Sequence, residues 1–302
     1  MRLTRWVNTC LTGSEHTSND LAKGWKGKRR MYDLIEKGFL QLVDTFYARW
    51  PRSVPAASGL AACKIISHRG QHDNLAVMEN TLKAFDMAVQ AGVWGLEFDI
   101  RWTRDLKPMV FHDQDLLRIF KDPLVIKKTD RQTLREKFPL IPTLEEVLER
   151  YGRRVHLMVE IKQEHYPDPQ RQTDMLADFF SGLQPVKDFH FLSLDVNMFD
   201  QVGFAPPSSC LPVAQLNFQT FSNLALSRGY AGVAGHFLFI NNRMAARHKA
   251  RGQHVGVGYP CSANSLFREV NRGVEWIFSN HAVEMQAVVD RYAGKVEGGR
   301  TL

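Results

Sequence analysis

From residue 64 onward, short runs of β-branched and aliphatic residues alternate with stretches whose apolar positions recur at helical spacing. Segments 81–91 and 144–151 are two of the helical stretches. Strands that alternate with helices are typical of βα units, which pair into a parallel sheet. The candidate strands are 64–67, 94–100, 155–161, 189–193, 211–216, 230–234, 254–257 and 275–278.

The number of these units favours a closed sheet. Eight βα units over this length of chain match a TIM (β/α)₈ barrel. A doubly wound open sheet is the alternative, but no GxGxxG motif follows the first candidate strand. We therefore predict an α/β protein, a TIM (β/α)₈ barrel with an N-terminal helical extension.

The first part of the chain has a different pattern. Residues 1–60 lack strand signals, and within them 31–50 has the apolar periodicity of an amphipathic helix, preceded by a basic segment at 23–30. We favour a helix that packs on the barrel. The alternative is a helix on a membrane surface, which would give a peripheral membrane contact through residues 23–50. The predicted domains are an extension at 1–60 and a barrel at 61–302.

Composition narrows the partners. The 302 residues carry a formal net charge of +7, which favours anionic partners such as phosphate esters or acidic membrane surfaces. No basic helix with interleaved base-reading residues stands out, so we predict no nucleic-acid binding. The four cysteines lie far apart, and neither a signal-peptide core nor a membrane-spanning run appears. We predict a cytoplasmic protein, at most peripheral to a membrane, and leave its oligomeric state open.

Candidate chemistry gathers where the first strands end. In segment 94–100, alternation places Glu97 and Asp99 on one face and the apolar residues on the other. In a barrel the apolar face turns outward to the helices, so both carboxylates point inward, and Glu160 ends another strand. A single buried glutamate is usually an ion-pair partner, but adjacent buried carboxylates repel unless a cation lies between them. Oxygen ligands of this kind suit Mg²⁺ or Ca²⁺.

Histidine and basic side chains follow the same strands. His68 ends the first strand, and His112 ends the apolar run at 108–111. Two imidazoles beside a metal site offer a general acid and a general base near neutral pH. Arg69 supplies a forked donor that matches phosphate oxygens, and Lys162 could hold a phosphate. The weaker candidates are His72, for which a surface position is favoured, and His236 and His281 at the rim.

Several linked motifs occur in a fixed order. They are His68-Arg69-Gly70, ENTL at 79–82, GLEFDI at 95–100, TRD at 103–105, PMVFHD at 108–113 with Arg118, IPTLEEVL at 141–148 and EIK at 160–162. In order and spacing these resemble the glycerophosphodiester phosphodiesterase family. The resemblance runs from His68 to Lys162, roughly the first half of the predicted barrel.

The resemblance implies a TIM barrel that hydrolyses a glycerol phosphodiester to sn-glycerol 3-phosphate and an alcohol, using Mg²⁺ or Ca²⁺. The implied metal ligands are Glu97, Asp99 and Glu160. The implied acid/base pair is His68 and His112. The implied phosphate contacts are Arg69 and Lys162, and Glu79 is implied as a metal ligand or a loop-ordering residue.

The second half departs from the family pattern. Ser193-Leu194-Asp195 still resembles its SFD segment, but 254–259 replaces a WTVN-like strand, and 278–281 replaces a strand that ends in TD. These departures concern the substrate pocket more than the catalytic core. We therefore keep two alternatives beside the glycerophosphodiesterase, a lysophospholipase D-type enzyme on membrane lipids and a non-catalytic barrel that binds phosphate or lipid.

Overall fold

The computed structural model describes residues 45–294. The chain divides into two compact units, Met1–Arg49 and Trp50–Leu302. Of the first unit, residues 45–49 are described, and they are helical. Most of the helix predicted at 31–50, and all of the basic segment at 23–30, lie outside the described residues. The predicted domain boundary at residue 60 therefore stays a prediction.

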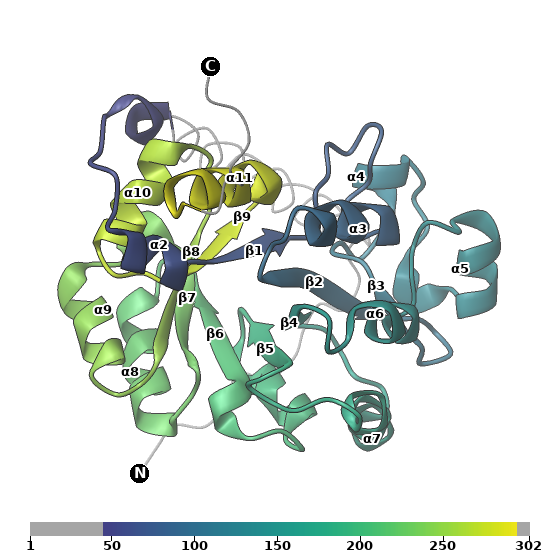
Figure 1. Ribbon diagram of the computed structural model, residues 1–302. Coiled ribbons are helices and arrows are strands. Elements are labelled where there is room, and N and C mark those ends of the chain that lie inside the picture. The colour runs from purple at the N-terminus through teal and green to yellow at the C-terminus, as the bar shows by residue number, and fades with distance from the viewer. Residues whose placement is uncertain (1–44, 295–302) are drawn as a thin grey trace, which may run out of the picture. The chain divides into compact units, whose positions relative to one another are not determined.

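Eight parallel strands of the second unit close into a barrel (Figure 1). Closure is explicit, because β1 pairs with β2 on one side and with β9 on the other. The strands are β1 (Lys64–His68), β2 (Gly95–Trp102), β4 (His156–Ile161), β5 (Phe189–Ser193), β6 (Cys210–Ala214), β7 (Gly232–His236), β8 (His254–Gly258) and β9 (Trp276–Ser279). The predicted TIM barrel is confirmed, and each candidate strand overlaps one of these eight. A short ninth strand, β3 (Pro108–Val110), pairs antiparallel with the end of β2.

Helices lie outside the strands (Figure 1). Their starts follow local sequence signals: Thr81 caps α3 by accepting from the Ala84 amide, and Thr143 with Glu146 forms a capping box at α6. The α-helices are α2 (Ala57–Ala62), α3 (Leu82–Gln90), α4 (Leu117–Phe120), α5 (Arg131–Lys137), α6 (Leu144–Tyr151), α7 (Pro169–Phe180), α8 (Phe218–Arg228), α9 (Asn242–Lys249), α10 (Ala263–Asn271) and α11 (Ala282–Tyr292). The short 3₁₀ segments are η1 (Ile126–Lys128), η2 (Val196–Val202), η3 (Pro207–Ser209) and η4 (Phe237–Phe239).

Stacked rings fill the barrel interior near the starts of the strands. Trp94 stacks on His156, Trp276 stacks on His254, and His156 Nε2 lies 2.7 Å from His190 Nδ1. Burial lowers the pKa of His156 to about 4, so that ring is neutral near pH 7. His156 and His190 therefore act as packing groups of the core, and His254 lies at its partly exposed edge.

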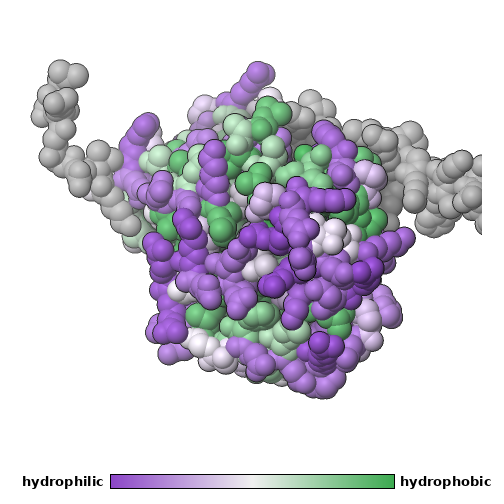
Figure 2. All heavy atoms as spheres, turned by 90° about the vertical axis from the view of Figure 1, so that its right-hand side faces the viewer, coloured by the Kyte–Doolittle hydropathy of each residue, from purple (hydrophilic) through white to green (hydrophobic). Residues whose placement is uncertain are grey.

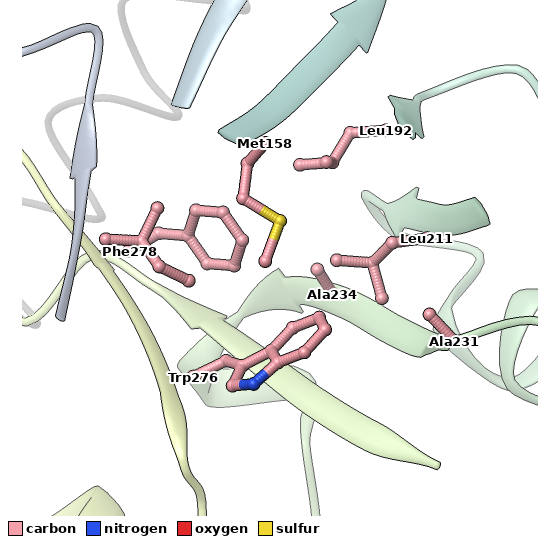
Figure 3. Close-up of a cluster of buried hydrophobic side chains, with 8 residues drawn as sticks. Met158, Leu192, Leu211, Ala231, Ala234, Trp276 and Phe278 are labelled. Atoms are coloured by element: carbon pink, nitrogen blue, oxygen red, sulfur yellow. The ribbon is translucent and has the colours of Figure 1, made fainter. Parts of the chain in front are cut away.

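An apolar layer follows toward the ends of the strands. Met158, Leu192, Leu211, Ala234 and Phe278 come from five strands and point toward one another (Figure 3). Each is at most 5% exposed, as expected for a packed barrel core rather than a pore. This layer separates the stacked rings from the polar groups at the carboxyl ends of the strands.

Hydrophilic side chains cover most of the face shown in Figure 2, with hydrophobic patches between them. Within residues 45–294, none of the helices has both the length and the apolar character needed to cross a membrane.

The apolar layer generates a stability prediction. Met158 is fully buried, so Met158→Ala should lower the free energy of unfolding by about 2–5 kcal/mol through lost burial and the cavity it leaves. Met87 on α3 is 39% exposed, and Met87→Ala should change it by no more than about 0.5 kcal/mol. Urea unfolding of both variants measures the difference, and equal losses would contradict the packed interior.

Candidate active site

Three carboxylates form a buried cluster at the carboxyl ends of β2 and β4. The parallel register sets Asp99 directly beside Glu160, and Glu97 lies two residues earlier on the same face. One oxygen from each carboxylate lies within 4.8 Å of the others. All three residues are less than 10% exposed. The structure thus brings together the three residues predicted to bind a metal.

Their mutual repulsion appears in the pKa values. Burial, together with the nearby Asp99 and Glu160, raises the pKa of Glu97 well above its ordinary value. Burial also acts to raise the pKa of Asp99, but Lys162 and Arg69 outweigh it and hold that pKa well below the ordinary value. The cationic neighbours therefore stabilise the ionised form of Asp99 more than that of Glu97.

Lys162 and Arg69 supply the opposite charge. Lys162 Nζ lies 2.6 Å from Glu160 Oε1 and 2.5 Å from Asp99 Oδ1, and Arg69 Nε lies 3.3 Å from Asp99 Oδ2. Asn80 belongs to the ENTL motif, and no site role was predicted for it. It adds a neutral donor, because its Nδ2 donates to Asp99 Oδ2 at 2.8 Å. Both predicted phosphate contacts thus lie against the carboxylates.

His68 is fixed from two sides by residues of the second half. Its Nδ1 lies 2.6 Å from Asn280 Oδ1, and its ring packs on Tyr259 at a centroid distance of 4.7 Å. Because the amide oxygen can only accept, Nδ1 carries the proton and Nε2 keeps its lone pair. Nε2 lies 3.7 Å from Glu97 Oε2. Burial and the charge of Arg69 lower the pKa of His68 to about 3.

His112 lies on the half-buried side of the same site. Its Nδ1 is 2.7 Å from Asp113 Oδ1, and its backbone oxygen accepts from Arg101 Nε at 3.0 Å. The adjacent carboxylate fixes the orientation of the imidazole ring. His112 is close enough to affect the pKa values of both His68 and Asp99. The two predicted histidines therefore share one site.

Glu79 orders the loop after β1. Its carboxylate accepts from Arg69 at 3.0 Å, from Asn74 at 2.8 Å and from two nitrogens of Arg118 at 2.5 and 2.8 Å. These partners outweigh burial and lower the pKa of Glu79. With its oxygens taken by arginines, Glu79 fits the loop-ordering role and lies outside the carboxylate cluster among the described residues.

The conformation of the loop after β1 also explains why the His68-Arg69-Gly70 motif ends in glycine. Gly70 has a φ of 78°, and a Cβ there would lie 2.7 Å from the backbone of Ala84. Arg69 itself has a φ of 62°, which turns its backbone amide toward the Glu97 carbonyl at 2.9 Å. Only glycine fits at position 70, because α3 approaches the chain closely there.

The remaining histidines take lesser positions. His72 has only 11% of its side chain exposed, and its Nε2 lies 4.0 Å from Glu79 Oε2, so the favoured surface position is not confirmed. His236 accepts from the Leu238 amide and caps η4, and His281 is exposed. None of these three belongs to the carboxylate cluster.

Known proteins resemble this chain over the segment that carries these motifs. Residues 68–191 match the glycerophosphoryl diester phosphodiesterase family. A glycerophosphodiester phosphodiesterase from Caldanaerobacter subterraneus is 34% identical over 110 residues, which are 32% of this chain and 44% of that relative. Glycerophosphodiester phosphodiesterase 1 of Rattus norvegicus is 32% identical over 131 residues, 37% and 38% of the two chains. The resemblance to the glycerophosphodiester phosphodiesterase family is confirmed.

Solved structures extend the likeness in fold. A glycerophosphodiester phosphodiesterase from Thermotoga maritima superposes with a TM-score of 0.64 at 20% identity, over 75% of this chain and 98% of that one. A phosphodiesterase from Oleispira antarctica, solved with the product sn-glycerol-3-phosphate, gives 0.64 at 21% identity, over 75% and 96%. The matched sequence spans less than half of the curated relatives, whereas the fold likeness covers nearly the whole of these structures. Every residue predicted as a metal ligand, acid/base group or phosphate contact lies within the family match at 68–191.

The Glu79 contacts generate a prediction. Glu79→Gln removes the charge that pairs Arg69 with Arg118, and should lower the free energy of unfolding by roughly 1–3 kcal/mol. Backbone amides of residues 71–80 should exchange with solvent deuterium faster, because the loop loses its central acceptor. Glu149→Gln, at an exposed position of α6, is the matched control and should change neither quantity. Unchanged exchange in Glu79→Gln would contradict the loop-ordering role.

Proposed function

We propose that this chain hydrolyses glycerophosphodiesters to sn-glycerol 3-phosphate and an alcohol, in a reaction that needs a divalent cation. The observation that carries the proposal is the meeting of three buried carboxylates with His68 and two cationic side chains at one end of the barrel. The family match over these residues supports it, as does the product named in the Oleispira antarctica structure.

Glu97, Asp99 and Glu160 would hold the cation. Carboxylate oxygens are the ligands that Mg²⁺ and Ca²⁺ prefer, and either ion suits this donor set. Asp99 Oδ1 is buried and accepts no hydrogen bond of good geometry within the described residues, although Lys162 Nζ lies 2.5 Å away. When bound, a divalent cation offsets the negative charge of the phosphodiester.

The histidines divide the proton transfers. His68 carries its proton on Nδ1, toward Asn280, so its Nε2 can accept the proton of the attacking hydroxyl. His112, oriented by Asp113, then protonates the departing alkoxide. The attacking hydroxyl is either water, which gives sn-glycerol 3-phosphate directly, or a free hydroxyl of the substrate's glycerol, which gives a cyclic phosphodiester that water must then open. His68 serves as the base for the attack in both cases.

Arg69 and Lys162 would bind the phosphate. Arg69 presents a fork of donors already held in place by Glu79, which limits its loss of conformational freedom on binding. Lys162 is fully charged, because Asp99 and Glu160 outweigh burial and raise its pKa. Its Nζ becomes available to phosphate oxygens once the carboxylates have another counter-charge.

The cellular setting remains a prediction. We retain a cytoplasmic protein, at most peripheral to a membrane, with a membrane contact through residues 23–50 as the alternative to a helix packed on the barrel. Nearly all of these residues lie outside the described part of the chain. A non-catalytic barrel that only binds phosphate or lipid is the outcome that the next experiment would reveal by an absence of turnover.

The function is tested with purified full-length protein and glycerophosphocholine, with release of sn-glycerol 3-phosphate as the measurement. We expect turnover with added Mg²⁺ or Ca²⁺, and a loss of about 10²–10⁴-fold in kcat in His112→Ala, the range typical of a removed general acid. His165→Ala, at an exposed position, is the matched control and should retain full turnover. A His112→Ala variant with wild-type turnover, or a wild-type protein with none, would refute the proposal.

The metal site is tested by binding as well as by rate. Chelator should abolish turnover, and Mg²⁺ or Ca²⁺ should raise the melting temperature of the wild-type protein, because the ion binds the folded state alone. Asp99→Asn should lose that metal-dependent rise. Asp178→Asn, on the exposed face of α7, should keep it. An equal metal-dependent rise in Asp99→Asn would exclude Asp99 as a ligand.

A further inference from the structure

A layer of aromatic and imidazole rings fills the barrel interior at the end opposite the carboxylates. We call this layer the barrel floor, and its members are Trp94, His156, His190, His254 and Trp276. Each lies at the start of a strand or one residue from it. Two of them, His156 and His190, are at most 6% exposed. The reaction proposed above uses neither, so two buried groups that can take up protons remain without a role.

Hydrogen bonds fix where the protons of this histidine pair lie. His156 Nδ1 is 2.9 Å from the backbone oxygen of Lys187, which can only accept, so in the neutral ring Nδ1 carries the proton and Nε2 keeps its lone pair. His190 Nδ1 lies 2.7 Å from that Nε2 and therefore donates to it. His190 Nε2 keeps a lone pair, and this buried atom has no hydrogen-bond partner within residues 45–294.

The geometry offers no place for a further proton. One added proton makes His190 Nε2 a buried N–H group that has no acceptor among the described residues. A second would set two N–H donors against each other across the 2.7 Å contact. Trp94 stacks on His156 at a centroid distance of 4.2 Å, and Trp276 packs edge-to-face on His190 at 5.0 Å, so both rings are shielded from water. Protonation of the pair therefore destabilises the folded state relative to the unfolded chain.

Nearby cationic groups act in the same direction as burial. Burial is the main reason that the pKa of His156 falls to about 4 and that of His190 to about 2, from an ordinary value of 6.5. Lys64, the first residue of β1, lowers both pKa values further, and so does His254 on β8. A proton added to the pair thus meets positive charge from two neighbouring strands.

The carboxylates near the floor offset this effect only in part. Asp188, just before β5, acts to raise the pKa of His156, but its Oδ2 already accepts from the Gln184 amide at 2.8 Å. Glu275, just before β9, lies beside His254, with 3.6 Å between its Oε2 and His254 Nδ1. Neither carboxylate accepts a hydrogen bond from the buried pair within the described residues.

We propose that the His156–His190 pair is a pH-sensitive switch, which holds the starts of β4 and β5 together while both rings are neutral and releases them by proton uptake at acidic pH. His190 is the register partner of Met158, so the pair lies where the two strands first meet. β4 also carries Glu160 near its other end, so its release disturbs the carboxylate cluster. The inference concerns the folded state and does not depend on the proposed reaction.

The direction of the pH effect follows from the two states. In the unfolded chain the histidines take up protons as the pH falls below 6.5, their ordinary pKa. In the folded protein the pKa is about 4 for His156 and about 2 for His190, so both rings stay neutral at pH 5. The stability that the neutral pair contributes is therefore complete above pH 6.5 and is lost progressively below it.

Urea unfolding of the full-length protein at pH 7, 6 and 5 tests the switch. His156→Gln can keep both hydrogen bonds, because an amide nitrogen can donate to the Lys187 oxygen and an amide oxygen can accept from His190 Nδ1. It removes one group that takes up a proton on unfolding. The rise in the unfolding equilibrium constant from pH 6 to pH 5 should therefore be about tenfold smaller than in the wild-type protein. His190→Gln, whose amide can still donate to His156 Nε2, should reduce the rise by a similar factor.

His165→Gln is the matched control, because His165 is exposed in the loop after β4 and water reaches its ring in the folded and unfolded states alike. It should show the wild-type rise. A wild-type rise in both floor variants would overturn the proposal, and so would an equal reduction in the control.

Nitrogen-15 NMR of the histidine-labelled wild-type protein tests the switch without any substitution, and it decides the matter if a floor variant does not fold. Nuclear Overhauser contacts to the rings of Trp94 and Trp276 identify the signals of His156 and His190. Both rings should carry their proton on Nδ1 at pH 7 and should remain neutral in the folded protein at pH 5.5. A proton on Nε2 of either neutral ring, or an imidazolium signal from either at pH 5.5, would exclude the switch.

Discussion

Repulsion among three buried carboxylates is the constraint on which the polar end of this barrel depends. Register between β2 and β4 forces Asp99 and Glu160 together, so neighbouring positions must supply positive charge. Arg69 does so, and Glu79 in turn holds Arg69 and connects it to Arg118 near the surface. Charges of alternating sign thus run from the barrel interior outward, and the loop after β1 takes its conformation from them.

The fold and the core of the site could be predicted because their signals are local. The alternation of apolar and polar residues along β2 is enough to set Glu97 and Asp99 on the inner face. Strand ends are equally local, so the positions of His68 and His112 followed from the apolar runs that precede them. Parallel strands bring such ends to one edge of a barrel, whatever the distances along the chain.

The remaining contacts could not be predicted because they depend on closure of the barrel. Asn280 lies 212 residues after His68, and the two meet only when β9 pairs with β1. The same holds for Tyr259, whose ring reaches His68 from the end of β8. Sequence alone also left open whether Glu79 binds a metal or orders the loop, and its two arginine partners favour the loop-ordering role.

The ionisable groups of the site come from β1, β2, β4 and the segments that join them, and the apolar layer of the interior lies between these groups and the opposite end of the barrel. Loops after β5 to β8 contribute chiefly neutral side chains around the mouth. A mutation in those later loops can alter which molecule enters without disturbing the charge balance beneath. The architecture therefore places most of the side chains around the mouth and the groups that carry the chemistry on different strands of one barrel.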